Sequence, residues 1–166
     1  MAVIPIKKLE QKAAEVIKKI EYLNISSVTP DGFPWGSPVY TSYDNDLNFF
    51  WVSWKENQHS INLAKNPNCF VTLYDSTVPC STGFGVYMSG TVKVVMNPIK
   101  MVKCLLVFYG RRGKQPRDVK QFLTSYPRRL YMFTPQKAWV NGDGEIDGNF
   151  IDIRTEICID NLKKLL

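Results

Sequence analysis

The sequence predicts a mainly β fold, an antiparallel barrel of short strands with helices packed outside it. Apolar runs of strand length follow one another through hairpin turns, whereas a parallel sheet would need a crossover helix between most neighbours. A chain of 166 residues buries roughly 70% of the surface that its unfolded form exposes, enough for one core. We therefore expect a single domain over residues 1–166. The composition, 45% hydrophobic and 22% charged, is that of a globular protein.

The chain begins with a helix and a hairpin. Residues 5 to 20 start at a proline and repeat their apolar side chains at helical period, which predicts an amphipathic helix. Residues 23 to 28 form a strand. Thr29-Pro30-Asp31-Gly32 then turns the chain, because proline presets its own φ and glycine tolerates a positive one. The return strand is expected at residues 36 to 43.

A third strand, residues 47 to 53, follows the turn Asp44-Asn45-Asp46. Its run Phe49-Phe50-Trp51-Val52 is apolar on both faces, which predicts a central position in the sheet. A short helix over residues 58 to 65 comes next. It ends at Asn66-Pro67, since proline cannot continue the helical hydrogen-bond ladder.

Two more strands occupy the middle of the chain, at residues 70 to 75 and 86 to 96, where β-branched and aromatic side chains dominate. Gly90 in the second strand indicates a bulge or a close backbone approach. The polar loop between them, residues 75 to 85, is long enough to be a candidate lid.

The last third is expected to hold two helices and further strands. The first helix, residues 99 to 109, has an Asn97-Pro98 start and a Gly110 stop. The remaining predictions are a helix at residues 116 to 126, strands at 128 to 133, 138 to 141 and 150 to 157, and a loop at 142 to 149.

Charge and cysteine content exclude several classes of function. The net charge of +6 attracts anions in general, but no nucleic-acid reader motif accompanies it, so we predict a solvated basic face and no nucleic-acid partner. Anionic substrates or phosphorylated cofactors stay open. The four scattered cysteines and the single histidine offer no zinc site, so no metal is expected. No leader and no apolar run of ~20 residues are found, which predicts a cytoplasmic protein that does not bind membranes.

Three motifs that resemble functional sites fail on context. Gly83-Phe84-Gly85 precedes a strand, whereas a nucleotide-binding glycine motif opens a helix. Residues 143 to 148 imitate the start of a calcium loop, but Arg154 stands where the bidentate glutamate belongs. A serine–histidine nucleophile would have to use His59, and no Gly-x-Ser-x-Gly elbow presents a serine to it. We therefore assign no catalytic side chain.

The passage from the third strand into the short helix is the most informative stretch. Ser53 ends the strand, and Asn57, Gln58 and His59 follow at the start of the helix, so these side chains and the turn amides surround one concavity. Amides at a helix start favour anions. Two interpretations stay open on spacing alone: a phosphate-binding corner, or an ordinary strand-to-helix turn with a partly exposed histidine.

A larger pattern covers most of the chain. The segments "PDGFPWGSPVY", "LNFFWVSWKENQHSINLAKNPNCFVTLYDS", "GVYMSGTVKVV" and "YMFTPQKAWVN" occur in this order. Together they resemble the pyridoxamine 5'-phosphate oxidase-like FMN-binding split-barrel family. The resemblance implies a six- to seven-stranded antiparallel split barrel with flanking helices. It also implies a homodimer with two FMN molecules in clefts where the protomers meet.

The resemblance also assigns cofactor contacts by position. The start of the return strand would line the flavin, the end of the third strand would meet the ribityl phosphate, and a late tryptophan would lie near the ring system. His59 stands where many relatives have lysine. Together with the corner, the predicted cofactor-binding residues are Ser37, Pro38, Val39, Tyr40, Val52, Ser53, Asn57, Gln58, His59 and Trp139.

The chain departs from true pyridoxamine phosphate oxidases. It lacks their Arg and Lys on the strand matching residues 37 to 42 and their late Arg-Leu-His segment, so pyridoxal phosphate synthesis is not expected. We expect an FMN-dependent oxidoreductase acting on a small substrate that the sequence does not identify. Two alternatives stay open: a protein that holds or senses flavin or haem without turnover, and a deazaflavin-dependent reductase.

Overall fold

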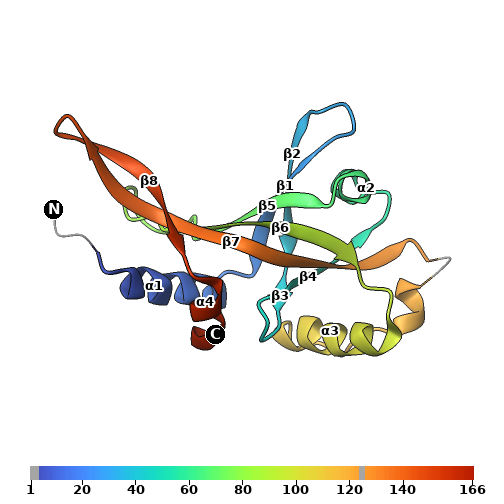
Figure 1. Cartoon of the computed structure of the whole chain (residues 1–166). Coiled ribbons are helices and arrows are strands. Elements are labelled where there is room, and N and C mark those ends of the chain that lie inside the picture. Colours follow the sequence, from blue (N-terminus) through green and yellow to red (C-terminus); the bar gives the residue numbers. More distant parts are fainter. Residues whose placement is uncertain (1–3, 124–125) are drawn as a thin grey trace.

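The computed structural model describes residues 4–123 and 126–166. Within them it shows an eight-stranded antiparallel sheet flanked by four α-helices (Figure 1). The strand order is β2-β1-β5-β6-β7-β4-β3, and β8 pairs with β7 outside this path. In chain order the elements are α1 (Ile6–Lys19), β1 (Tyr22–Val28), β2 (Pro34–Tyr40), β3 (Ser42–Tyr43), β4 (Phe49–Trp54), α2 (Gln58–Lys65), β5 (Asn68–Tyr74), β6 (Gly85–Val94), α3 (Pro98–Arg111), the 3-10 turn η1 (Val119–Phe122), β7 (Arg128–Ile146), β8 (Asn149–Ile157) and α4 (Ile159–Leu165).

The antiparallel split barrel with flanking helices is confirmed. The N-terminal half follows the prediction closely, and α2 has the predicted bounds. The expected return strand at 36 to 43 divides at Thr41, which is one reason why the described residues hold eight strands where six to seven were predicted. The Thr41 Oγ1 donates to the backbone oxygen of Phe50 at 3.0 Å, so the break is tied to β4.

Strand β4 lies between two hydrophobic clusters, as its apolar faces predict. Phe49 and Trp51 belong to the larger cluster inside the barrel, and Phe50 belongs to a smaller cluster under α3. Val52 packs against the smaller cluster as well. Because side chains alternate along a strand, Ser53 at the end of β4 points to the same side as Trp51.

The bulge predicted at Gly90 is confirmed. The β6–β7 register shifts between Ser89, which pairs with Lys137, and Gly90, which pairs with Pro135. A Cβ atom at Gly90 would lie 2.2 Å from the backbone oxygen of Thr134. Only glycine fits this close approach.

Two predictions in the last third are wrong. The helix expected at 116 to 126 is the single turn η1 within the described residues, and its last two positions before Tyr126 lie outside them. Leu123 is already extended, and Pro127 disfavours a helix just before it. The strands expected at 128 to 133 and 138 to 141 are one strand, β7, which continues to Ile146 where a loop was expected. Pro135 does not interrupt it, because it lies at the bulge.

Strand β7 returns as β8 through a tight turn. Asp147 and Gly148 both have positive φ, 50° and 79°, as a two-residue hairpin turn requires. Helix α4 was not predicted. Its start is held by Glu10 of α1, whose carboxylate accepts from the Cys158 amide at 3.3 Å and from Asn161 Nδ2 at 2.9 Å.

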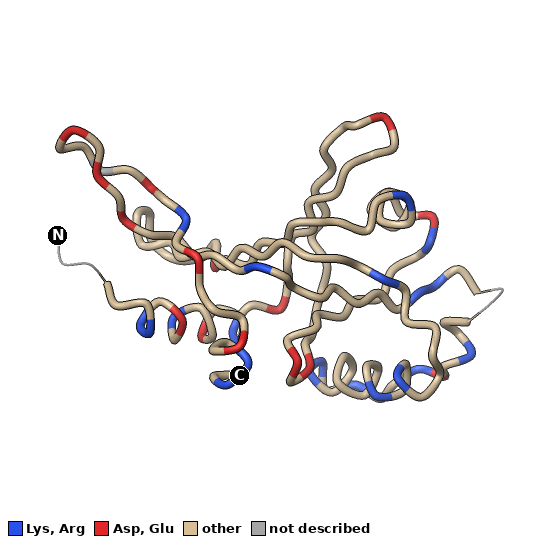
Figure 2. Tube along the Cα trace, viewed as in Figure 1, with Lys and Arg blue, Asp and Glu red and all other residues tan. Residues whose placement is uncertain are grey.

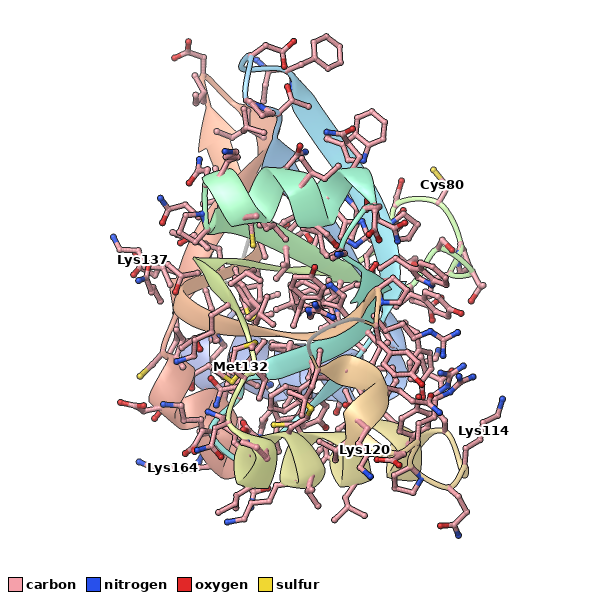
Figure 3. The ribbon with its side chains drawn as sticks, turned by 90° about the vertical axis from the view of Figure 1, so that its right-hand side faces the viewer. Cys80, Lys114, Lys120, Met132, Lys137 and Lys164 are labelled. Atoms are coloured by element: carbon pink, nitrogen blue, oxygen red, sulfur yellow. The ribbon has the colours of Figure 1, made fainter. Side chains whose placement is uncertain are left out.

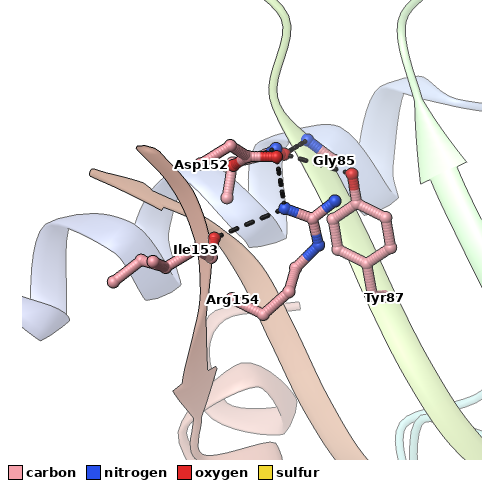
Figure 4. A network of polar contacts seen from close by, with 6 residues as sticks. Gly85, Tyr87, Asp152, Ile153 and Arg154 are labelled. Carbon is pink, nitrogen blue, oxygen red and sulfur yellow. Dashed lines mark hydrogen bonds and ion pairs between the residues drawn. The ribbon is translucent and has the colours of Figure 1, made fainter. Parts of the chain in front are cut away.

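The outer part of β7 and β8 forms an arm, residues 141 to 154, that projects beyond the barrel (Figure 1). Asn141 ties its base to β6, because its Oδ1 accepts from the Gly85 amide at 2.6 Å. Arg154 pairs with Asp152 at 2.7 Å and lies over the ring of Tyr87, 4.2 Å from its centroid (Figure 4). Figure 2 shows that acidic residues follow this arm, whereas basic residues gather around α3 and the segment after it.

In the described residues no helix is long and apolar enough to cross a membrane. Over the same residues, no cluster of three or more His, Cys, Asp or Glu side chains could hold a metal ion.

Candidate functional site

The end of β4 and the start of α2 form a compact polar corner. Ser53 Oγ accepts a hydrogen bond from Asn57 Nδ2 at 2.7 Å and lies 2.9 Å from His59 Nε2. Ser53 and His59 are only 6% and 7% exposed. Ser53, Asn57 and His59 therefore meet as the spacing predicted, and His59 is buried, not partly exposed as expected for an ordinary turn.

Local hydrogen bonds explain why the chain bends here. The Asn57 amide donates to the backbone oxygen of Trp54 at 3.1 Å, and the amides of Ser60 and Ile61 donate to the backbone oxygen of Asn57. The Asn57 side chain is used by Ser53 and does not cap the helix. The amides of Gln58 and His59 have no backbone acceptor among the described residues, so these two first-turn amides of α2 are the ones available to an anion.

Burial lowers the pKa of His59 below its ordinary value, because the charged imidazolium loses hydration. The ring is therefore neutral at pH 7. When Nε2 carries no proton, the Ser53 hydroxyl donates to it while accepting from Asn57. A phosphate dianion at the corner would raise the pKa again, since a nearby opposite charge favours the protonated ring.

A serine 2.9 Å from a histidine is also the geometry of a nucleophile and its base. Such a base is normally oriented by a third group. Across residues 4–123 and 126–166, no side chain is hydrogen-bonded to the other ring nitrogen of His59.

Gln58 does not join the corner. Its Nε2 donates to Asn62 Oδ1 at 2.8 Å, and Asn62 Nδ2 donates to Ser27 Oγ at 3.0 Å. Asn62 is fully buried, so this chain of hydrogen bonds fastens α2 to β1. Gln58 therefore takes part in the attachment of α2 to β1.

A cavity of about 480 Å³ opens beside the corner, between the end of β4, α3 and the segment after α3. It is lined by three of the predicted residues, Tyr40, Val52 and Ser53. Trp54 and Phe108 add aromatic walls. The Tyr40 hydroxyl is buried and has no hydrogen-bond partner among the described residues.

The net charge predicted only a solvated basic face, but four cationic residues also line this cavity: Arg112, Lys114, Arg117 and Arg128. The guanidinium of Arg112 lies 4.7 Å from the ring centroid of Tyr40, and that of Arg128 lies 6.0 Å from the ring of Trp54. The dense basic run after Gly110 was the available signal. The β4–β7 register, which sets Arg128 opposite Trp54, was not foreseeable from spacing.

The other predicted residues lie elsewhere in the single chain. Ser37 Oγ accepts from Trp35 Nε1 at 3.2 Å, Pro38 lines a separate groove near Asp75, and Val39 packs against the barrel core. Trp139 stacks on Phe70, with ring centroids 6.0 Å apart. The single chain therefore brings together Tyr40, Val52, Ser53, Asn57 and His59, but not these four.

Comparisons with known proteins agree with this fold. A sequence model of the family described as pyridoxamine 5'-phosphate oxidase matches residues 9–125. A comparison with curated protein sequences found no match. Among solved structures, a haem storage protein from Vibrio cholerae is 15% identical with a TM-score of 0.66, covering 80% of this chain and 94% of that one.

Two further solved structures are similar at low identity. A haem-binding protein from Mycobacterium smegmatis is 10% identical with a TM-score of 0.64, and the match covers 99% of this chain but only 62% of that protein. An F420 reductase is 18% identical with a TM-score of 0.56, covering 76% of this chain and 94% of that one. At such identities the likeness shows the fold alone.

Proposed function

Because the chain belongs to the pyridoxamine 5'-phosphate oxidase family, we propose that it is an FMN-binding oxidoreductase that acts on a small substrate. The observation that carries the proposal is the Ser53–Asn57–His59 corner, in which Ser53 and His59 are buried and Ser53 also lines an aromatic-walled cavity. Bound FMN would supply hydride or electron transfer, and the protein would supply orientation and a pocket.

The residues of this chain fit a phosphorylated ring. Ser53 Oγ, the first-turn amides of α2 and His59 would hold the ribityl phosphate. Tyr40 and Val52 would lie along the flavin, and the unpaired Tyr40 hydroxyl would find a hydrogen-bond partner there. The cations of the cavity offer the positive charge that is missing from residues 37 to 42.

We further propose a cytoplasmic homodimer with the flavin between protomers. Ser37, Pro38, Val39 and Trp139 lie away from the corner in one chain, so a partner is needed if they are to reach the same cofactor. Light scattering at micromolar concentration should give about twice the 19.0 kDa chain mass. A 19 kDa species in the presence of FMN would rule out a shared cleft.

An absorption spectrum tests the cofactor. We expect freshly purified protein to be yellow, or the colourless protein to take up one FMN per chain. His59→Ala and Ser53→Ala should each weaken FMN binding by about tenfold or more, because hydrogen bonds to a charged phosphate contribute about 1.5–3 kcal/mol. Lys137→Gln, an exposed cation outside the cavity, is the matched control. If both variants bound FMN with unchanged affinity, the corner would be an ordinary strand-to-helix turn that does not bind the phosphate.

A non-catalytic flavin- or haem-binding protein is the second candidate, supported by the two similar structures named for haem. Rapid reduction of the bound cofactor by NAD(P)H would favour the enzyme, and a cofactor inert to every donor would favour the binder. The similarity to an F420 reductase supports a deazaflavin as a further candidate cofactor. The absorption spectrum tests this candidate as well, since a deazaflavin and FMN absorb differently.

A further inference from the structure

The outward face of α3 is apolar, where a helix on a protein surface normally presents polar side chains. Ile99 is 72% exposed, Leu106 55% and Val102 44%. Residues separated by three, four or seven positions lie on the same side of a helix, so these three side chains form one apolar stripe. The opposite side of α3 packs on the smaller hydrophobic cluster under β4. Packing within this chain therefore does not account for the stripe.

Cations accompany the apolar stripe. From Ser76 to Arg117 the sequence holds no Asp or Glu. Lys100 and Lys103 are exposed on α3, and the ion pairs found among the described residues use neither of them. Lys120 is exposed on η1, which packs against α3, and Figure 3 shows it at the same end of the molecule. The stripe and its surroundings on α3 are thus apolar and positively charged.

Acidic residues adjoin α3 only outside this stretch. Arg111, the last residue of α3, lies 5.4 Å from the ring centroid of Tyr43, which brings Asp44 and Asp46 of the next turn to the C-terminal end of the helix. Asp118 begins η1, where it accepts from a backbone amide of that turn at 2.9 Å. The stripe begins in the first turn of α3, so these carboxylates leave most of its length without a negative neighbour.

The charges decide between two ways of covering such a face. If two copies of α3 packed about a two-fold axis, their lysines would meet, and neither helix carries an acid to neutralise them. A bilayer with anionic lipids offers both complements at once, because apolar side chains enter the boundary of the acyl chains while lysines extend to the phosphates. Lying on a bilayer needs no apolar run of ~20 residues, which is the length required to cross one.

We propose that the outward face of α3 attaches the protein to a membrane surface rich in anionic lipids. Ile99, Val102 and Leu106 would enter the boundary between headgroups and acyl chains, and Lys100 and Lys103 would bind lipid phosphates. Figure 1 shows α3 on the outside of the molecule, away from the arm. The residues proposed to share the flavin between protomers lie on β2 and β7, so this attachment is compatible with that dimer and does not depend on the flavin.

The lysines are tested by co-sedimentation of the full chain with lipid vesicles. We expect binding to phosphatidylcholine vesicles that contain about 30% phosphatidylglycerol, and binding at least tenfold weaker to phosphatidylcholine alone. Lys100→Gln/Lys103→Gln should weaken binding by about thirtyfold, since each cation near an anionic surface contributes a factor of about five. The control is Lys7→Gln/Lys8→Gln, which removes two exposed lysines from α1 and leaves the same net charge.

The apolar stripe is tested by a charge placed within it. Leu106→Glu should abolish vesicle binding, because the carboxylate would face lipid phosphates of the same sign. Ile146→Glu is the matched control, since Ile146 is 58% exposed but lies on the arm. Urea midpoints close to that of the wild type verify that both variants fold, and the lysine variants test the same face if Leu106→Glu does not.

Four results would overturn the inference: no binding to anionic vesicles at millimolar lipid, equal binding to both kinds of vesicle, equal losses in the two lysine variants, or wild-type binding by folded Leu106→Glu. Self-association of the wild type without vesicles, if Leu106→Glu removes it, would also overturn it, because a second copy would then cover the face. Binding of FMN is measured separately, so the flavin and the membrane proposals can fail independently.

Discussion

Replacing Ser53 by alanine tests the corner through the stability of the unliganded chain. The hydroxyl meets Asn57 Nδ2 at 2.7 Å and His59 Nε2 at 2.9 Å, so the change removes two hydrogen bonds. Asn57 is exposed and its amide can turn to water, whereas His59 is 7% exposed and loses a buried partner. An unpaired buried polar group costs about 1–3 kcal/mol. We expect the free energy of unfolding to fall by that amount.

Urea unfolding followed by tryptophan fluorescence measures the effect, because Trp51 is buried and stacks on Tyr131 in the core. For a chain of this size, thermal unfolding should shift down by roughly 3–9 °C. Ser42→Ala is the control: its hydroxyl is equally buried but has no partner among the described residues, so its loss should cost less than about 0.5 kcal/mol. If Ser53→Ala were as stable as Ser42→Ala, the hydrogen bonds of the corner would contribute nothing to the free energy of unfolding.

Three other outcomes are expected. Burial lowers the pKa of His59, so the unfolded chain takes up a proton at this residue more readily than the folded chain does. The contribution of His59 to stability is therefore fully present above about pH 6.5 and declines as the pH falls below that value. Urea midpoints between pH 5 and 8 should show this decline in the wild type and a flatter profile in His59→Gln; identical profiles would contradict it. Gly90→Ala should destabilise the fold by about 1–3 kcal/mol or more in thermal unfolding, because its Cβ meets the Thr134 backbone oxygen, whereas Gly83→Ala, with nothing within 4 Å, should be neutral. At pH 8 a thiol reagent should modify Cys80 and Cys158 in the folded chain, whereas burial raises the pKa of Cys69 to about 12 and that of Cys104 to about 11, so these two should react only on unfolding; rapid modification of all four would refute this.

The sequence predicted those parts of the fold whose signals are local. Pro5, Asn66-Pro67 and the period of the apolar residues placed α1 and α2 nearly to the residue. The two-faced apolar run of β4 and the glycine of the β6 bulge were likewise predicted correctly. Elements that depend on partners distant in the sequence were not predicted. Helix α4 needs Glu10 at its start, and β7 passes through Pro135 only because Gly90 lies opposite.

In the candidate site, too, the features set by local spacing were predicted and those set by tertiary contacts were not. Spacing predicted that Ser53, Asn57 and His59 would meet, since they are separated by one turn. It could not show that Gln58 turns toward Asn62, because that choice depends on Ser27 in another strand. The cationic lining of the cavity depends on tertiary contacts as well: α3 folds back under β4 and brings the chain after it to the mouth.

The arm divides β7 into halves of unequal stability. Residues 131–133 of the strand pair with both β4 and β6, and residues 138–140 pair with both β6 and β8, but from Asn141 to Ile146 it pairs only with β8. Backbone amides near the tip should therefore exchange with deuterium far sooner than those within the barrel. A foreign peptide inserted between Asp147 and Gly148 would affect only this two-stranded arm. The turn is therefore a suitable place to graft an epitope or a fluorescent reporter without disturbing the cavity.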